Sequence, residues 1–356
     1  MKNFYTAPED TFANTPIYIT RFLNLSDSKR NSTAPTPAPE RIVAIDQFRG
    51  FAILLMILAD FINNINTVPP WLKHAPDIGY TIIDLVAPLF VFAIGLTYGL
   101  SFRRRLDRYG PWKTYNHFFS RNLALIGLGF LITLGGVLSK NYPPMANWGL
   151  LQALGAAGLI TLPLIRIQAK YRWIFGILLL GLYQVLLDRY WLSEVIYAVH
   201  NGPQGALSWG AMLVIATSMG DFFLLRPKNR RYFAWLSMAI LILGSLLVIY
   251  VPISKHRASA SYMLVSLGLS GLIFFAFYIL NGHYRIHFPL LTDFGQNPLL
   301  LYLLHGLFLA WFVLPPFPVW YFEAPLWLVA IQAVVFVAVL SWIIRFFNRK
   351  GWYLTI

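Results

Sequence analysis

Residues 41–95 read RIVAIDQFRGFAILLMILADFINNINTVPPWLKHAPDIGYTIIDLVAPLFVFAIG, and this stretch decides the class of fold. Two long apolar segments flank a short polar loop that contains Lys73 and His74. The apolar segments themselves contain four ionisable residues: Asp46, Arg49, Asp60 and Asp84. An ionisable side chain in hydrocarbon costs about 2.5–3.5 kcal/mol on insertion scales, so such residues usually serve a function or pair with one another. The stretch therefore predicts two membrane helices with chemistry built between them.

The composition of the whole chain also indicates a membrane protein. Of the 356 residues, 58% are hydrophobic and only 12% are charged, whereas soluble domains have about 25% charged residues. The absence of cysteine excludes disulfides, thiolate nucleophiles and cysteine metal sites. The net charge of +14 comes from basic residues that lie between apolar segments and form no continuous patch, which argues against nucleic acid as a partner. We therefore expect a polytopic protein in a lipid bilayer.

Apolar segments of about 20 residues are long enough to cross a bilayer as helices. Such segments predict an all-α fold with about ten transmembrane helices, at approximately 43–63, 79–101, 120–139, 149–165, 172–187, 207–225, 232–251, 261–280, 297–314 and 325–346. With the N-terminus in the cytoplasm, 23 of the 28 Lys and Arg residues fall on the cytoplasmic side, as the positive-inside rule requires. Both termini are therefore expected in the cytoplasm, and the loop with His74 on the outer side.

The segments between and outside these spans are more polar. Residues 1–40 predict a flexible cytoplasmic tail, 41–348 a transmembrane domain and 349–356 a short cytoplasmic tail. Two long loops are expected, a basic one on the cytoplasmic side at 103–121 and a polar, aromatic one at 188–206.

Asp46 and Arg49 lie three residues apart, so on a helix they share one face and can form an ion pair. This pair is either structural, at the membrane interface, or its arginine meets an anionic ligand from the cytoplasm, because a guanidinium suits phosphate oxygens. Asp60 lies 14 residues beyond Asp46. At ~1.5 Å per residue this is about 21 Å along the helix, which places Asp60 in the outer half of the membrane.

His74 and Asp84 stand on either side of a turn signal. On one straight helix they would be ~15 Å apart, but Pro76 and Gly79 between them permit a fold-back. A histidine beside a carboxylate is the usual combination for general-base catalysis. The alternative is an interfacial histidine that only hydrogen-bonds lipid headgroups.

Other polar residues are candidates for ligand contacts. The basic segment with Arg103, Arg104 and Arg105 either follows from the positive-inside rule alone or holds the phosphates of a nucleotide-bearing donor. The candidates for contacts to an acceptor substrate are Lys73, Gln152, Asn297 and His305. The other histidines are expected in loops, with no partner at a diagnostic spacing: His117, His200, His256, His283 and His287. Since no metal-ligand pattern is present, no metal site is expected.

The segments RIVAIDQFRGFAILLMILADF, WLKHA and IIDLVAPLFVFAIG, in this order and spacing, resemble the catalytic membrane domain of the heparan-α-glucosaminide N-acetyltransferase family and its bacterial members. LLQALG and GQNPLLLYLLHGLF look like later signatures of that family and extend the resemblance over roughly 41–310. The resemblance implies a multi-helix acyltransferase that takes an acetyl group from cytoplasmic acetyl-CoA and delivers it to a glucosamine-type amine on the other side. It also implies that His74, as base or nucleophile, and Asp84 are catalytic. The Asp46–Arg49 pair and the arginines of the basic segment are then the expected contacts of acetyl-CoA.

Two departures from the family pattern concern the acceptor. Asp60 stands where the animal enzyme has Asn, and is expected to be protonated or to bind the acceptor amine. Ala153 stands where the family has Arg after Leu-Gln, which disfavours an acidic, sulfated glycan. We therefore expect an acyltransferase of the bacterial cytoplasmic (inner) membrane that acts on an amino sugar or another envelope saccharide, as a monomer or a homodimer. The alternative is a proton-coupled transporter or flippase in which Asp60, Asp84 and His74 form a relay.

Overall fold

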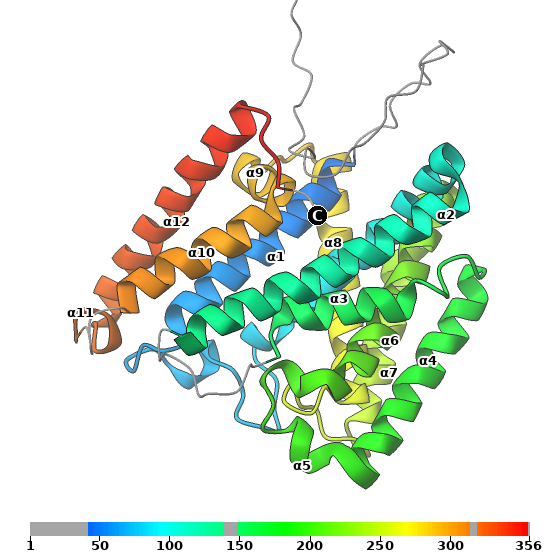
Figure 1. Ribbon diagram of the computed structural model, residues 1–356, viewed down its shortest axis with the longest axis horizontal. Coiled ribbons are helices and arrows are strands. Elements are labelled where there is room, and N and C mark those ends of the chain that lie inside the picture. Colours follow the sequence, from blue (N-terminus) through cyan, green and yellow to red (C-terminus); the bar gives the residue numbers. More distant parts are fainter. Residues whose placement is uncertain (1–41, 139–147, 314–318, 355–356) are drawn as a thin grey trace, which may run out of the picture.

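The computed structural model describes residues 42–138, 148–313 and 319–354, which form an all-α protein (Figure 1). Its α-helices are α1 (Val43–Ile62), α2 (Val86–Leu138), α3 (Leu150–Thr161), α4 (Ala169–Leu186), α5 (Leu192–Val195), α6 (Gly202–Leu225), α7 (Phe233–Leu247), α8 (Ala260–Gly282), α9 (Pro289–Gln296), α10 (Pro298–Val313), α11 (Val319–Phe322) and α12 (Leu326–Arg349). Each segment expected as a span contains one of these helices or part of one. The all-α prediction is confirmed.

Within the described residues, six helical stretches are long and apolar enough to cross a membrane: Ile83–Leu134, Ala169–Val195, Val199–Leu225, Pro227–Leu247, Ala260–Gly282 and Leu326–Arg349. Helices α3 and α10 are apolar but shorter, and α1 has 20 residues of which three are charged. The protein is thus a multi-pass membrane protein. The number of ten spans and the cytoplasmic position of both termini stay predictions, and the expected tail at 1–40 lies outside the described residues.

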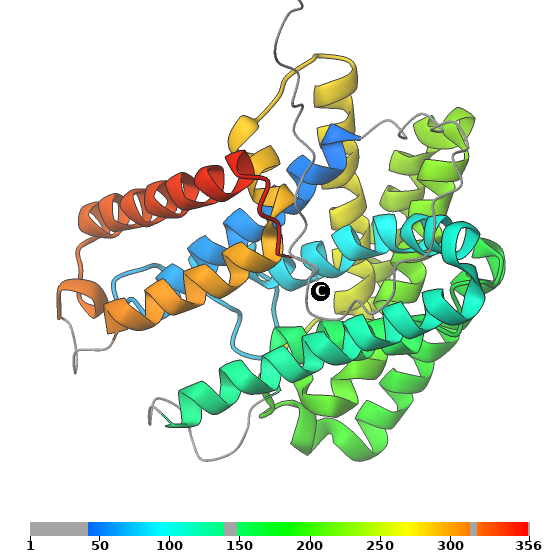
Figure 2. The ribbon, with the colours of Figure 1, turned by 45° about the horizontal axis from the view of Figure 1, so that its top comes forward.

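The expectation of a loop at 103–121 is wrong, because this segment belongs to α2. The helix is interrupted at Gly110, where φ is 76° and ψ is 173°. Glycine adopts this positive φ without a Cβ clash, and Pro111 then has the φ of a first helical turn. The two parts of α2 consequently run back alongside each other (Figure 2). The loop expected at 188–206 is also largely helical, with a π-helical turn, α5 and a 3-10 turn.

Helix α1 packs against α2, α8, α9, α10 and α12, and its contact with the short helix α9 is unusually close. A Cβ on Gly50 would lie 1.8 Å from the backbone oxygen of Leu291, and a Cβ on Gly295 would lie 1.8 Å from that of Asp46. Glycines let membrane helices approach backbone to backbone. This contact fixes the half of α1 that carries Asp46 and Arg49.

Helix α6 is the buried centre of a second group of helices and packs against α2, α3, α4 and α8 (Figure 1). A buried carboxylate, Asp221 on α6, accepts hydrogen bonds from Arg172 on α4 and Arg103 on α2. Arg172 also donates to Thr217, at 2.9 Å. A buried charge needs partners of the opposite sign, so these bonds tie three helices together.

Candidate active site

Asp84, at the start of α2, organises the loop that precedes it. Its side chain is fully buried. Oδ2 accepts hydrogen bonds from the backbone nitrogens of Ala75 (3.2 Å) and Thr81 (2.9 Å). The Thr81 hydroxyl lies 3.1 Å from the same oxygen and 2.8 Å from the backbone oxygen of Lys73. These contacts fold residues 73–84 back on themselves.

The fold-back places His74 against Asp84. Nδ1 of His74 lies 2.8 Å from Oδ1 of Asp84. A carboxylate only accepts hydrogen bonds, so a neutral imidazole here carries its proton on Nδ1 and a lone pair on Nε2. The His74 side chain is 29% exposed, so it is not sealed inside the protein as Asp84 is.

A second loop, between α7 and α8, brings a lysine to His74. Nζ of Lys255 lies 3.0 Å from Nδ1 and 2.9 Å from Nε2 of His74. Burial lowers the pKa of Lys255 to about 8, against the negative charges of Asp84 and Asp60, which raise it. Lys255 is not predicted from the sequence, because it lies 181 residues from His74 and no spacing connects the two.

An ion pair joins these two loops. Nε of Arg257 donates to both carboxylate oxygens of Asp77, at 2.9 and 3.1 Å, and NH2 of the same arginine also binds Asp77. Ser254 donates to Asp77 as well, at 2.9 Å. The hydrogen bond with Arg257 lowers the pKa of Asp77 and raises that of Arg257. Both groups therefore stay charged, and their bonds hold the segment around Lys255 against the His74 loop.

The structure also joins Asp60 and His305, which the sequence singles out separately. Nε2 of His305 lies 2.9 Å from Oδ2 of Asp60, and Nδ1 lies 3.2 Å from the backbone oxygen of Leu301. His305 is buried, whereas the side chain of Asp60 is 46% exposed. Because the charge of Asp60 acts on Lys255, this pair belongs to the same group of charges as His74 and Asp84.

A cavity of about 670 Å³ begins at Arg49, towards the other end of α1. Among the described residues, its lining contains His117, no carboxylate side chain and five arginines: Arg49, Arg104, Arg105, Arg108 and Arg121. Arg49 is held by hydrogen bonds of 3.4 Å to Thr97 and to the backbone oxygen of Gly295. Guanidinium groups bind phosphate oxygens with two parallel hydrogen bonds, so this part of the cavity suits a phosphorylated ligand.

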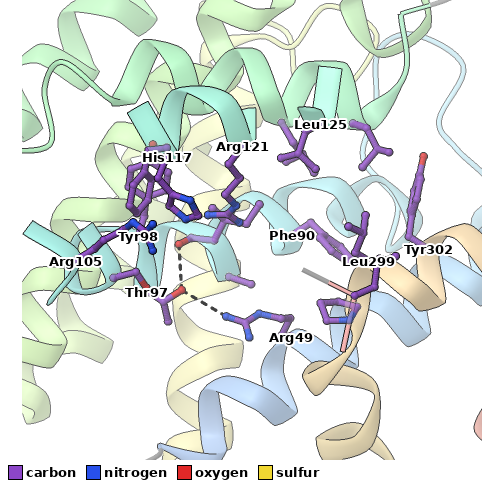
Figure 3. Close-up of a pocket in the computed structure, with 18 of the residues that line it drawn as sticks. Arg49, Phe90, Thr97, Tyr98, Arg105, His117, Arg121, Leu125, Leu299 and Tyr302 are labelled. Carbon is purple, nitrogen blue, oxygen red and sulfur yellow. Dashed lines mark hydrogen bonds between the residues drawn. The ribbon is translucent and has the colours of Figure 1, made fainter. Parts of the chain in front are cut away.

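The rest of the cavity is apolar and aromatic. In Figure 3, Arg105, His117 and Arg121 lie on one side, and Leu125, Leu299 and Tyr302 on the other. The ring of Tyr302 contacts the ring of His305, with centroids 5.4 Å apart. The apolar part of the cavity therefore approaches the His305–Asp60 pair.

The structure places Arg103 away from this cavity, on the face of α2 that meets α6, where both of its terminal nitrogens bind Asp221. Helical periodicity explains this difference from the two arginines that follow. The cavity residues Thr97, Ser101 and Arg108 follow one another at intervals of four and seven residues along one side of α2. Periodicity along 97–108 is the signal that could have identified Arg108 as a cavity residue, whereas Arg121 lies beyond the break at Gly110 and the spacing does not extend to it.

The other candidate residues have structural contacts. Asp46 lies 3.6 Å from Arg49, as their spacing indicates. Gln152 is buried and binds Gly149 and Thr133, at the contact between α3 and α2. Asn297 binds the backbone of the C-terminal segment through both ends of its amide. The roles expected for these residues in binding stay predictions.

This fold and this site define a class of protein: a multi-pass helical membrane protein with a histidine–carboxylate pair and an arginine-lined cavity joined by α1. Residues 41–238 match the family of the heparan-alpha-glucosaminide N-acetyltransferase catalytic domain, and the chain belongs to this family. The chain is also similar to human heparan-alpha-glucosaminide N-acetyltransferase, with 32% identity over 141 residues. That alignment covers 37% of this chain and 20% of the human protein, so the chain matches about a fifth of the length of its relative.

Proposed function

We propose that this protein transfers an acetyl group from cytoplasmic acetyl-CoA to the amine of an amino sugar, or to another envelope saccharide, on the outer face of the bacterial cytoplasmic membrane. The observation that carries the proposal is the arrangement of two sites along α1. Arg49 lines the cavity, and Asp60 lies 11 residues further along the same helix. At ~1.5 Å per residue this is roughly 16 Å, a distance that the extended pantetheine arm of CoA can span.

Acetyl-CoA fits the two parts of the cavity. The diphosphate and 3′-phosphate of its nucleotide would bind the arginines, and its pantetheine arm would lie along the apolar side between Leu299 and Tyr302. This orientation brings the thioester towards the His305–Asp60 pair, which Tyr302 contacts. The polyanionic nucleotide then stays at the cytoplasmic end, and only the pantetheine arm with its acetyl thioester reaches the outer half of the membrane.

The acceptor would bind next to His74, at the end of α1 that carries Asp60. In a direct transfer, Nε2 of His74 takes a proton from the acceptor nitrogen as it attacks the thioester carbon. A carbon–nitrogen bond forms, the carbon–sulfur bond breaks, and the sulfur leaves as thiolate. Asp84 holds the proton on Nδ1 of His74, at 2.8 Å, and so keeps Nε2 basic. Asp60, with its exposed carboxylate, would attract the ammonium form of the acceptor, which gives up one proton to water before the neutral nitrogen attacks.

Purified protein in detergent, given labelled acetyl-CoA with and without glucosamine, tests this proposal. The chain contains no cysteine, so a thiol reagent measures released CoA without a background from the protein. We expect glucosamine-dependent release of CoA that is lost in His74→Ala and kept in His283→Ala, which changes an exposed histidine at the end of α8. If the wild type neither releases CoA nor binds acetyl-CoA, the proposal is refuted.

Two further arms define the chemistry. N-acetylglucosamine, whose amine is blocked, should not replace glucosamine as acceptor, and turnover with it would indicate transfer to a hydroxyl group. Label that stays on the wild type but not on His74→Ala, in the absence of acceptor, would identify His74 as the nucleophile of an acyl-imidazole route.

A further inference from the structure

Lys255 contacts His74 but takes no part in the acetyl transfer as proposed. It lies between α7 and α8, beyond residues 41–238 that match the family. The nitrogen of its side chain is almost equally close to both ring nitrogens of His74, at 3.0 Å from Nδ1 and 2.9 Å from Nε2, of which Nε2 would take the proton of the acceptor. A cation at this distance opposes protonation of the imidazole, whereas a neutral amine does not oppose it and can accept a proton from the imidazolium.

The surroundings of Lys255 favour an amine that changes its charge near neutral pH. The titratable groups that face it are Asp60 on α1, His74 and Asp84 between α1 and α2, His200 before α6, and the adjacent His256. Burial outweighs the two carboxylates and lowers the pKa of the lysine to about 8. Neutral and charged forms of the amine are therefore both populated at slightly alkaline pH.

The backbone of Lys255 is held in place. Nδ2 of Asn201 donates to the backbone oxygens of Lys255 and His256, at 2.8 Å each. Asn201 is buried, and its Oδ1 accepts a hydrogen bond from Nε1 of Trp209 at 3.1 Å. With the Asp77–Arg257 ion pair on the other side, the lysine is presented to His74 by a braced loop. Such bracing is what a group needs for repeated proton transfer at a fixed distance.

We propose that Lys255, as the neutral amine, accepts the proton that His74 removes from the acceptor, so that the base of the site is a Lys255–His74–Asp84 relay. This inference rests on the proposed acetyl transfer. The proton leaves the acceptor nitrogen for Nε2 of His74 and then moves to Nζ of Lys255, which becomes an ammonium. The thiolate leaves with the electron pair of the broken carbon–sulfur bond, and Lys255 returns its proton to that sulfur or to water before the next turnover. No group is oxidised or reduced.

The absence of cysteine from the chain allows an exact chemical test of the amine. Lys255→Cys removes it, and 2-bromoethylamine then rebuilds an S-aminoethyl side chain with a slightly more acidic amine. We expect Lys255→Cys to lower kcat by about 10²-fold or more, as for loss of a general base. Alkylation of this variant should then raise its kcat by about tenfold or more. Lys228→Cys, at an exposed site after α6, is the control for alkylation and should keep wild-type activity throughout.

The pH profile separates proton transfer from a structural role. Activity should rise with pH as Lys255 loses its proton, and the rise should move to lower pH in the alkylated protein, whereas the titration of the acceptor amine is the same in both. Lys255→Arg keeps the charge but stays protonated, so its activity should be no higher than that of Lys255→Cys. Wild-type activity in Lys255→Arg or in Lys255→Cys, or an unshifted profile after alkylation, would overturn the relay.

A measurement that does not depend on turnover distinguishes failure of the relay from failure of the proposed function. Acetic anhydride acetylates an amine only in its neutral form. The pH dependence of its reaction with Lys255, followed by mass spectrometry, therefore gives the titration of this residue. We expect a midpoint near pH 8 that shifts in His74→Gln, because the two groups share a proton. If the titration midpoint of Lys255 is the same in the wild type and in His74→Gln, the relay is overturned. If the wild type releases no CoA, the acetyl transfer on which the relay rests is refuted.

Discussion

Asp84→Asn changes the tautomer of His74 while keeping the shape of the site. Oδ2 of Asp84 accepts from two backbone N–H groups, those of Ala75 and Thr81. Both are fixed donors, so the single oxygen of an asparagine must face them. Its NH2 group then faces Nδ1 of His74, where Oδ1 lies at 2.8 Å in the wild type. Nδ1 must now accept, and the proton of the neutral ring moves to Nε2.

The expected result is a loss of catalysis with binding intact. With a proton on Nε2, His74 has no lone pair there to accept the proton of the acceptor. General-base catalysis, which contributes about 10²–10⁴-fold to kcat, is then lost. The KM for acetyl-CoA should stay within about twofold of the wild-type value, because Asp84 is not among the residues that line the arginine-lined cavity. A lower kcat with an unchanged KM indicates the loss of an interaction that is made only in the transition state. Stability should fall by about 1.5–3 kcal/mol, the range for a hydrogen bond to a charged group. CoA release and thermal unfolding measure the two effects separately.

Asp293→Asn is the matched control. Asp293 also pairs with a cation, Arg345, at 3.0 Å, but both side chains are partly exposed. Exposed pairs contribute about 0–1 kcal/mol, so this variant should unfold and turn over like the wild type. A folded Asp84→Asn protein with a kcat within threefold of the wild type, across the pH range, would refute the argument that Asp84 sets the tautomer of His74.

Three further variants probe the other parts of the structure. Arg121→Gln should raise the KM for acetyl-CoA about tenfold with little change in kcat, since a charge-assisted hydrogen bond is worth about 1.5–3 kcal/mol; an unchanged KM would remove Arg121 from the donor site. Asp60→Asn should raise the KM for glucosamine but not for acetyl-CoA, and equal effects on both would contradict its assignment to the acceptor. Gly295→Ala should lower the unfolding temperature, because its Cβ would lie 1.8 Å from a backbone oxygen of α1 and such overpacking costs about 1–3 kcal/mol. Gly306→Ala, with nothing within 4 Å of the new Cβ, should be neutral or slightly stabilising, and equal effects of the two substitutions would contradict the close α1–α9 contact.

Local signals predict part of this site and tertiary contacts decide the rest. The Asp46–Arg49 pair follows from helical spacing, and the approach of His74 to Asp84 follows from the turn residues between them. Lys255 reaches His74 from 181 residues away, and a single sequence contains no signal for a contact between two such loops. The break in α2 is a case between these two. Gly110 and Pro111 mark a turn, but whether the basic segment around them is coil or helix depends on packing against α3 and α6.

The charges of the two sites differ in sign, and this difference supports a reaction across the membrane over transport of a whole substrate. The described lining of the arginine-lined cavity has five arginines and no carboxylate side chain, whereas near His74 the carboxylates of Asp60 and Asp84 act on Lys255. A polyanionic nucleotide would be stabilised in the first and repelled by the second, and an ammonium acceptor would experience the reverse. A transporter needs a path on which one substrate is stable at both ends. An arrangement that holds each substrate at its own end, and lets only a neutral acetyl group pass between them, is what acyl transfer requires.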